Sequence, residues 1–285
     1  MKSFNNKVAA ITGAGSGIGR SLAQQLARQG CHLALADING EQLQATRDSI
    51  LSDAQAPKNL LITTSVVDVA DRNQVEKFAA QVMADHGRVN LVFNNAGVAV
   101  DAELSDASYA DMEWLMGINF WGVVHGSKAF LPHLMAGEAG HIVNISSVFG
   151  LFAVPGQSIY NGSKFAVRGF TEALRLECRY TPVNVSAAFP AGIKTNIARN
   201  ARMALAEGES REKRVRFAEA LFVNSADRAA ADILAGVTKN KARILVGRGA
   251  GWADFLSRVM PVWTGNLIAF LRRKTERRKV VAGSV

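Results

Sequence analysis

Short, almost continuously apolar segments alternate with longer segments of helical periodicity along most of this chain. Apolar runs of this kind are typical of strands that are buried on both faces, as in a parallel sheet. Within the intervening residues 71–86, Val75, Phe78 and Val82 fall on one helical face. The predicted strands are residues 7–12, 32–37, 59–65, 90–93, 141–146, 183–189 and 242–246. This alternation predicts an α/β fold, a single doubly wound domain built on a seven-stranded parallel sheet.

Two stretches depart from the alternation. Residues 191–222 form a long excursion between the sixth and seventh predicted strands, and residues 250–285 extend past the last one. Excursions beyond the carboxyl ends of strands are where α/β proteins build their substrate covers. We therefore expect a sheet domain over residues 1–249, with a helical cover at about 191–222. Residues 250–285 are expected to form an amphipathic, basic helical extension.

Composition sets broad limits on the class of protein. The 285 residues are 48% hydrophobic and 20% charged, which suits one large core rather than a disordered chain. The two cysteines, Cys31 and Cys178, are expected to be free thiols in a reducing cytosol. The first predicted strand starts too early to leave room for a signal peptide, and no apolar run reaches the ~18 residues of a membrane span. We therefore expect a cytoplasmic protein.

Positive charge is unevenly placed, with a net charge of +9. One basic cluster lies within residues 199–216, and a second lies near the end of the chain, where a single acid, Glu276, accompanies six basic residues. The members of the second cluster are Arg272, Arg273, Lys274, Arg277, Arg278 and Lys279. Two interpretations are open: solvated surface, or contact with an anionic partner. No recognisable nucleic-acid module accompanies either cluster, so we expect no nucleic acid as partner.

A glycine-rich turn follows the first predicted strand and leads into an amphipathic helix. Glycine permits tight turning and lets backbone N–H groups approach a pyrophosphate, to which the helix N-terminus adds further donors. The glycines follow the spacing G-x-x-x-G-x-G rather than the strict G-x-G-x-x-G. The residues expected to bind the dinucleotide here are Gly13, Ser16, Gly17, Ile18 and Gly19. This strand–turn–helix arrangement predicts a Rossmann-type nucleotide site.

Asp37 indicates which dinucleotide is bound. It ends the second predicted strand, eighteen residues after Gly19, where an acid that binds the adenosine ribose is expected. A carboxylate accepts hydrogen bonds from ribose hydroxyls and repels a 2′-phosphate, and the next residue is Ile38 rather than arginine. We therefore expect NAD, with NADP as the alternative. The competing interpretation of Asp37 is an ordinary surface acid at a strand end.

Several motifs in a fixed order resemble the short-chain dehydrogenase/reductase family over roughly residues 5–247. They are TGAGSGIG at 12–19, Asp68, NNAG at 94–97, Asn119, Ser147, YNGSK at 160–164 and a segment from Pro190 to Thr195. The resemblance implies a nicotinamide-dependent oxidoreductase with no metal. It also implies that Asp68 and Val69 meet the adenine, that Asn95, Ala96 and Gly97 adjoin the cofactor ribose, and that Pro190, Ile193 and Thr195 run beside the nicotinamide. One departure is Pro190-Ala191-Gly192, where the family usually has Pro-Gly.

Tyr160 and Lys164 are the predicted centre of proton transfer. Four residues apart, they share a face of a helix. A phenol with a pKa of ~10 is a poor base at neutral pH. A nearby ammonium group and an oxidised nicotinamide favour the phenolate and are expected to lower that pKa. In the family this lysine also holds the nicotinamide ribose.

Two further catalytic residues are predicted from the same resemblance. A serine that positions the substrate carbonyl maps to Ser147, thirteen residues before Tyr160, with its neighbour Ser146 as a rival. An asparagine that supports a water in a proton relay maps to Asn119.

The expected reaction is hydride transfer between the nicotinamide and a secondary alcohol or ketone, with Tyr160 as the acid or base. Two alternatives are an NADP-linked carbonyl reductase and a dinucleotide-binding regulator without catalysis. The presence of Ser147, Tyr160 and Lys164 argues against the second. The resemblance implies a homo-dimer or homo-tetramer.

The C-terminal extension carries an apolar stripe at helical spacing. Its residues are Trp252, Phe255, Leu256, Val259 and Met260, followed after Pro261 by Trp263, Leu267, Phe270 and Leu271. One interpretation is packing against the sheet domain or another subunit. The other is an amphipathic lid that touches anionic lipid at the membrane surface through its basic end. The second would suit a lipophilic alcohol or ketone, or an acidic acyl derivative.

Overall fold

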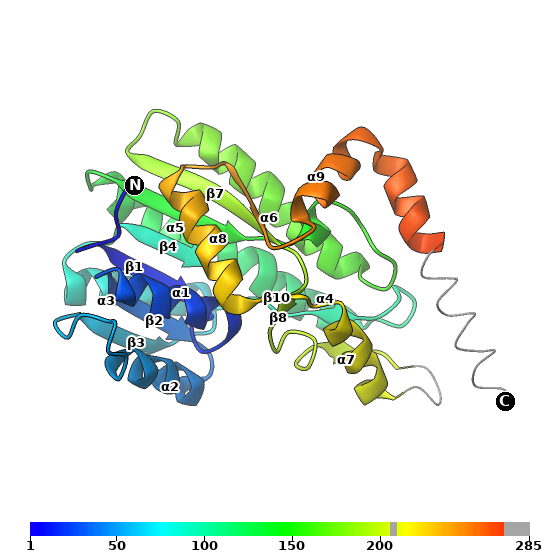
Figure 1. Cartoon of the computed structure of the whole chain (residues 1–285), viewed down its shortest axis with the longest axis horizontal. Helices are drawn as coiled ribbons and strands as arrows, with labels where there is room; N and C mark the ends of the chain where they lie inside the picture. Colours follow the sequence, from blue (N-terminus) through cyan, green and yellow to red (C-terminus); the bar gives the residue numbers. More distant parts are fainter. Residues whose placement is uncertain (206–209, 271–285) are drawn as a thin grey trace.

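The computed structural model describes residues 1–205 and 210–270, and its centre is one parallel sheet of seven strands (Figure 1). The strands lie in the order β11-β7-β6-β4-β1-β2-β3. Their bounds are β1 Val8–Thr12, β2 His32–Asp37, β3 Ile62–Val66, β4 Leu91–Asn94, β6 Gly140–Ile145, β7 Val183–Pro190 and β11 Arg243–Val246. The predicted seven-stranded, doubly wound α/β fold is confirmed.

Helices pack on both faces of this sheet. Those of the main layers are α1 Gly17–Arg28, α2 Gly40–Leu51 and α8 Ala226–Thr238 on one face, and α3 Arg72–His86, α5 Gly122–Met135 and α6 Ser158–Glu177 on the other. Strand β1 shows why both layers are needed. Ala9 and Ile11 point into the first layer, and Val8 and Ala10 point into the second. Because successive side chains of a strand face opposite sides, an entirely apolar strand must be covered twice.

The strand order reverses between β1 and β4. From β1 the chain adds β2 and β3 on one side, and from β4 it adds β6, β7 and β11 on the other. All neighbouring strands are parallel, so their carboxyl ends share one edge of the sheet. Such a reversal leaves a crevice outside the carboxyl ends, where α/β proteins bind ligands.

The cover between β7 and α8 contains more extended chain than the sequence predicted. One helix, α7 Arg211–Ala220, is accompanied by the short strands β8 Ile193–Lys194 and β9 Arg202–Met203. Strand β8 pairs with β10 Asn224–Ser225, and β9 pairs with β5 Val100–Asp101, which lies shortly after β4. These pairings depend on segments distant in sequence, and they satisfy backbone N–H groups that a helix would otherwise satisfy within itself.

The chain past β11 forms α9 Ala250–Val259, and residues 261–270 are also helical. The remaining predicted parts of the extension, Leu271 and the basic cluster from Arg272 to Lys279, lie outside the described residues. In the described part of the chain, no helix is both long enough and apolar enough to span a bilayer.

His141, near the start of β6, is a fully buried imidazole. The Ser186 hydroxyl donates to the carbonyl of Lys241 at 2.6 Å and lies 2.7 Å from Nε2 of His141. Nε2 therefore carries the proton, and Nδ1 has no hydrogen-bond partner. Burial, aided by the N-terminal ammonium and Arg175, lowers the pKa of His141 to about 3. The native protein holds this ring neutral.

We predict that His141 destabilises the protein in acid. Between the ordinary histidine pKa of 6.5 and about 3, the unfolded chain binds a proton that the folded protein does not. The free energy of unfolding should therefore decrease as the pH is lowered through that window. This group should contribute up to about 1.4 kcal/mol of that decrease per pH unit. Urea unfolding of His141→Gln from pH 7 to 4 should show a shallower loss of stability than wild type. Equal slopes for wild type and this variant would contradict the prediction.

Candidate functional site

The glycine-rich loop between β1 and α1 is built for close backbone approach. Gly13 and Gly17 have φ values of +65° and +52°, which favour glycine. A Cβ on Gly13 would lie 2.8 Å from the Cα of Ala96, and a Cβ on Gly19 would lie 2.1 Å from the carbonyl oxygen of Gly13. No side chain caps the first turn of α1, whose N-cap is Ser16, so its N–H groups are available to an anion.

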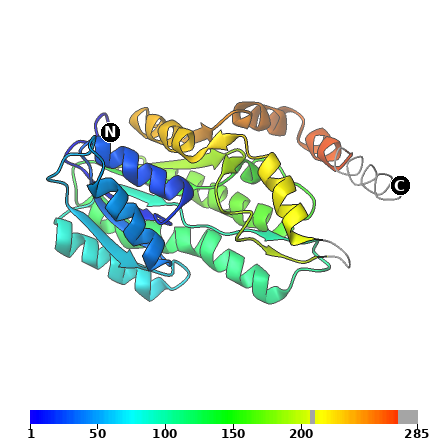
Figure 2. The same cartoon turned by 60° about the horizontal axis from the view of Figure 1, so that its bottom comes forward.

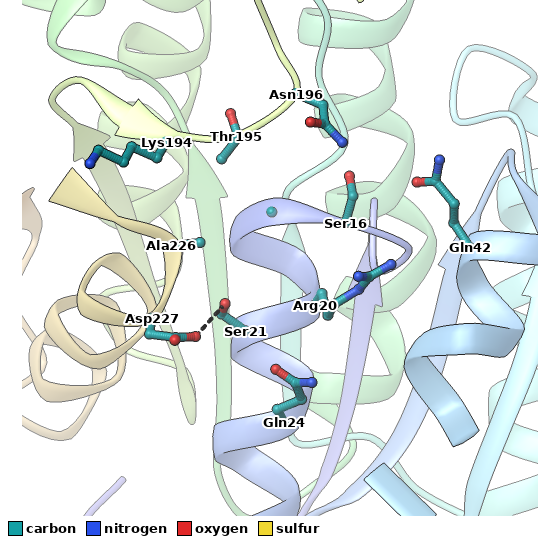
Figure 3. A pocket seen from close by; sticks show the side chains of 11 residues that line it. Ser16, Arg20, Ser21, Gln24, Gln42, Lys194, Thr195, Asn196, Ala226 and Asp227 are labelled. Carbon is teal, nitrogen blue, oxygen red and sulfur yellow. Dashed lines mark hydrogen bonds between the residues drawn. The ribbon is translucent and has the colours of Figure 1, made fainter. Parts of the chain in front are cut away.

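A cavity of about 570 Å³ opens beside this loop (Figure 3). Figure 3 shows Thr195 and Asn196 of the cover facing Ser16 at the start of α1. The lining residues are Ser16, Gly17, Arg20, Ser21, Gln24, Gln42, Lys194, Thr195, Asn196, Ala226 and Asp227. The structure thus brings together Ser16, Gly17 and Thr195, which the sequence analysis had placed in two separate motifs. Arg20 and Lys194 also line the cavity, and no sequence motif had singled them out.

Asp37 lies at the carboxyl end of β2 with its carboxylate directed at the glycine-rich loop. One oxygen accepts a hydrogen bond from Gly15 N at 2.8 Å, and the other accepts from Asn39 N at 2.9 Å. A carboxylate has further acceptor sites beyond these two. The neighbouring Ile38 side chain is exposed, as is that of Val66 at the end of β3. An acid and two apolar side chains therefore surround the edge of the sheet where a ribose and an adenine are expected.

The turn after β4 is fastened to the end of β1. The backbone N–H groups of Asn95 and Ala96 donate to the Thr12 hydroxyl at 3.1 and 3.2 Å. The Asn95 amide donates to the carbonyl oxygens of Thr12 and Gly13 at 3.0 and 3.1 Å. Asn95 therefore braces the glycine-rich loop from the side. Thr12, the first residue of the TGAGSGIG motif, takes part in all but one of these hydrogen bonds, although the sequence analysis assigned it no role of its own.

Ser147 and Tyr160 meet in a buried part of the site. Ser147 follows β6 and caps the short helix η2 Val148–Gly150, accepting from Phe149 N at 3.1 Å. Its hydroxyl is also hydrogen-bonded to the phenol of Tyr160. Ser146 faces elsewhere, since its hydroxyl donates to the carbonyl of Lys164 at 2.8 Å. The geometry thus favours Ser147 over Ser146 as the serine that positions the substrate carbonyl.

Lys164 lies one helical turn after Tyr160 on α6 and is buried. Its ammonium group donates to the carbonyl of Ile145 at 3.1 Å and lies 5.7 Å from the centre of the Tyr160 ring. A Cβ on Gly97 would approach Nζ of Lys164 to 3.4 Å and Oδ1 of Asn119 to 3.2 Å. The absence of a side chain at Gly97 keeps this position open beside both polar groups.

Burial dominates the ionisation of both α6 residues. It raises the pKa of Tyr160 to about 12, with the Ser147 hydrogen bond acting in the opposite direction, and it lowers the pKa of Lys164 to about 8. The expected lowering of the phenol pKa by Lys164 together with an oxidised nicotinamide stays a prediction. In the chain by itself, removal of the phenolate from water is the dominant effect on the pKa of Tyr160.

Asn119 occupies a π-helical turn, Gly117–Trp121, between α4 Tyr109–Met116 and α5. Its fully buried amide accepts from Val98 N at 2.8 Å and donates to Val98 O at 3.0 Å and to the Ser163 hydroxyl at 3.2 Å. Single π-helical turns inside α-helices are frequent at functional sites. Here the amide ties the chain after Gly97 to the helix that carries Tyr160.

The remaining predicted cofactor residues line the same edge of the sheet. Asp68 accepts from Ala70 N at 2.9 Å, and Val69 is buried after β3. Pro190 ends β7, Ile193 lies in β8, and the Thr195 methyl group is 2.9 Å from where a Cβ on Gly17 would lie.

The unusual Ala191 does not occupy a strained position. Within the described chain the only non-glycine residues with positive φ are Asn6 and Asn240, whereas Gly192 has φ +52°. A Cβ on Gly192 would lie 2.6 Å from the carbonyl oxygen of Leu221. The glycine that this loop requires is thus Gly192, and alanine is accommodated before it.

An apolar cluster surrounds the Tyr160 ring. Phe149 lies edge-on to Tyr160, with ring centres 6.1 Å apart and an angle of 88°. The other apolar residues of this cluster are Val98, Ala99, Val100, Ala102, Ala107, Trp114, Leu115, Ile159, Ile197 and Ala204. They come from the turn after β4, from α4, from the start of α6 and from the cover, so only the folded chain assembles them. No group of three or more His, Cys, Asp or Glu residues suited to a metal occurs in the described part of the chain.

Comparison with known proteins adds the family context. The family model described as short chain dehydrogenase matches residues 7–206. A Mycobacterium tuberculosis protein named as an oxidoreductase, SadH, is 47% identical over 263 residues, which are 91% of this chain and 93% of that protein. A short-chain dehydrogenase/reductase from Burkholderia phymatum, solved with NAD, has a TM-score of 0.83 and 32% identity and covers 93% of this chain and 97% of its own. The structure of levodione reductase has a TM-score of 0.76 and 27% identity, and the match covers 88% of this chain and 98% of that chain.

We predict that Gly19→Ala weakens both the fold and dinucleotide binding. The added methyl group would lie 2.1 Å from Gly13 O, so the loop must shift, at a cost of about 1–3 kcal/mol in stability. Gly169→Ala on α6 meets nothing within 4 Å and should stabilise the protein by about 0.5–1 kcal/mol. Thermal unfolding and NADH fluorescence titration test both variants. Normal NADH affinity in Gly19→Ala would count against this loop as the cofactor site.

Proposed function

The chain belongs to the short-chain dehydrogenase/reductase family, and on that premise we propose that it oxidises secondary alcohols, or reduces ketones, with NAD and with Tyr160 as the acid or base. Members of this family are NAD(P)-dependent oxidoreductases. The observation that carries the finer proposal is the meeting of Ser147, Tyr160 and Lys164 in one buried site next to the glycine-rich loop and the Gly97 turn.

The residues at this edge of the sheet fit a nicotinamide dinucleotide. The uncapped first turn of α1 and the positive-φ glycines suit a pyrophosphate, and Asp37 suits an adenosine ribose. Gly97 leaves room beside Lys164, where the second ribose would be held. When bound, the cofactor accepts or supplies the hydride, and the protein has to position the substrate and handle the proton.

Side chains of this protein can transfer the proton that the reaction requires. The buried phenol of Tyr160 is protonated at neutral pH, which makes it the acid that a ketone oxygen needs. Ser147 shares a hydrogen bond with that phenol and is placed to hold the same substrate oxygen. In the direction of alcohol oxidation, Tyr160 must lose its proton first, and positive charge from Lys164 and from an oxidised nicotinamide favours that loss.

The substrate we propose is lipophilic. The side chains packed around Tyr160 are aromatic and aliphatic, and apolar surroundings favour apolar substrates because their contact removes both surfaces from water. As an alternative, an NADP-linked reductase conflicts with the charge of Asp37. A non-catalytic regulator would have no need of the buried Ser147–Tyr160 pair.

Two proposed partners follow from the same premise: the alcohol or ketone itself, and further copies of this chain in a homo-dimer or homo-tetramer. Independently of that premise, we retain the predicted contact of residues 250–285 with an anionic membrane surface. We also retain the division of the chain into a catalytic domain over 1–249 and an extension over 250–285 as part of this proposal.

Replacing the phenol tests the mechanism. We predict that Tyr160→Phe lowers kcat by at least about a thousandfold, because the acid or base is lost while the ring remains. NADH affinity should be nearly unchanged. Tyr180→Phe is the matched control, since Tyr180 is 92% exposed, and it should retain full activity. A panel of lipophilic secondary alcohols assayed for NADH formation supplies the readout, and an active Tyr160→Phe enzyme would refute the proposed role.

Neutralising Asp37 tests the cofactor preference. Asp37→Asn retains an oxygen that can accept from Gly15 N and removes the negative charge. A charge-assisted hydrogen bond contributes about 1.5–3 kcal/mol, so NAD affinity should fall by roughly ten- to a hundredfold. NADP affinity should rise. Titration of both cofactors measures the ratio, and a wild-type preference for NADP would contradict the assignment.

A further inference from the structure

Helix α9 is attached to the protein by its polar side. Asp254 forms an ion pair of 2.8 Å with Arg243 on β11, and Arg243 also lies 3.3 Å from Glu172 on α6. The side chains of Arg243 and Asp254 are only 16% and 15% exposed. Arg258, one turn further along α9, adds a 3.2 Å contact to Asp254. The Arg243–Asp254 pair holds one face of α9 toward the sheet domain, whereas the Arg258–Asp254 pair lies within the helix.

The inward side of α9 is completed by small residues. Ala250 is fully buried and Ala253 is partly buried, and both belong to the apolar cluster that contains Phe149 and Phe152. Alanine lets the helix approach closely without placing a large side chain in the interface. The α9 contact with the sheet domain therefore includes two alanines and a buried ion pair.

The large apolar residues of α9 face water, apart from Leu256, which is half-buried. Trp252, Phe255 and Val259 are 72%, 54% and 60% exposed. Their spacing places them on one helical face, and the Trp252 and Phe255 rings contact each other edge to face at 6.1 Å. A surface helix of a globular protein normally turns its apolar stripe toward the core, and this one does the reverse. These three side chains do not pack against the sheet domain, so packing against another subunit and contact with lipid are the two predicted roles left for them.

The apolar surface continues past α9. In the helical residues 261–270, the side chains of Val262, Trp263 and Phe270 are exposed, while Thr264 is buried and donates to Met260 O at 2.7 Å. Figures 1 and 2 both place α9 and these residues at the margin of the molecule, extending away from the sheet. Exposed apolar surfaces of this kind mark interaction sites. We name the exposed side chains of Trp252, Phe255, Val259, Val262, Trp263 and Phe270 the α9 face.

Charge next to the α9 face indicates the kind of partner. Arg258 is exposed on α9 itself, and the sequence directly after Phe270 carries six basic residues against one acid, Glu276. A second copy of this chain offers no compensating charge, because each copy has a net charge of +9. Anionic lipid offers both the apolar layer for tryptophan and phenylalanine and the negative charge for arginine and lysine.

We propose that the α9 face inserts into the interface of an anionic membrane. The Arg243–Asp254 ion pair holds α9 with this face directed outward. The α9 helix packs directly behind η2, whose Phe149 borders Tyr160. The enzyme then works at the surface in which a lipophilic alcohol or ketone is dissolved. This last consequence rests on the proposed function, whereas the insertion itself does not.

Vesicle sedimentation tests the insertion without requiring turnover. The full chain is spun with vesicles of phosphatidylcholine alone and of phosphatidylcholine with phosphatidylserine. Wild-type protein should sediment with the second and much less with the first, and added salt should weaken binding. Trp252→Ser combined with Phe255→Ser should reduce sedimentation at least about tenfold, since two interfacial aromatic anchors are lost. Leu61→Ser combined with Tyr180→Ser removes two exposed apolar side chains elsewhere and should sediment like wild type.

Three further readouts separate the outcomes. NADH affinity should be equal in all variants, which shows that the fold is intact. Wild-type protein that stays in the supernatant with both kinds of vesicle overturns the proposal. So does light scattering that shows the Trp252/Phe255 variant falling from dimer to monomer with no vesicle binding by wild type, because the α9 face would then be a contact between copies. If wild-type protein sediments with anionic vesicles but shows no alcohol dehydrogenase activity, the proposed insertion of the α9 face stands and only the proposed enzymatic function is refuted.

Discussion

The junction between the glycine-rich loop and the turn after β4 holds the site together. At this point the strand order reverses, so the chain continues from β1 into α1 on one face of the sheet and from β4 toward α5 on the other. The Thr12 hydroxyl and the Asn95 amide join the halves through four hydrogen bonds to backbone groups. A side chain at Gly13 would force the two turns apart. The crevice in which the dinucleotide is proposed to lie therefore depends on this contact.

The catalytic helix is tied to the same edge through buried polar groups. Asn119 bridges Val98, just after the Gly97 turn, and Ser163 on α6. Between α6 and the end of β6, the Ser146 hydroxyl donates to the carbonyl of Lys164, and the Lys164 ammonium donates to the carbonyl of Ile145. Each of these groups is buried and would destabilise the fold without a partner. Their pairing fixes the position of α6 relative to the sheet, so the Tyr160 phenol meets Ser147 within the apolar cluster around the Tyr160 ring.

Much of this arrangement could be predicted from the sequence because local rules govern it. Apolar alternation located all seven strands, and residue spacing placed Tyr160 and Lys164 on one helical face. The ionisation of Tyr160 could not be predicted in the same way, since it depends on how completely the folded chain excludes water from the phenol. The pairing of β9 with β5 was also missed, because two-residue strands joined over a hundred positions apart leave no periodic signal.

Helix α9 shows the division between sequence and tertiary structure plainly. By itself the sequence determined that residues 250–259 form an amphipathic helix, because the stripe of Trp252, Phe255 and Val259 is a property of spacing alone. It did not determine which way that stripe faces. Only the tertiary structure decided this, through the buried pair of Asp254 with Arg243 on β11. A charge removed from water must keep its partner, and that requirement turns the apolar face outward.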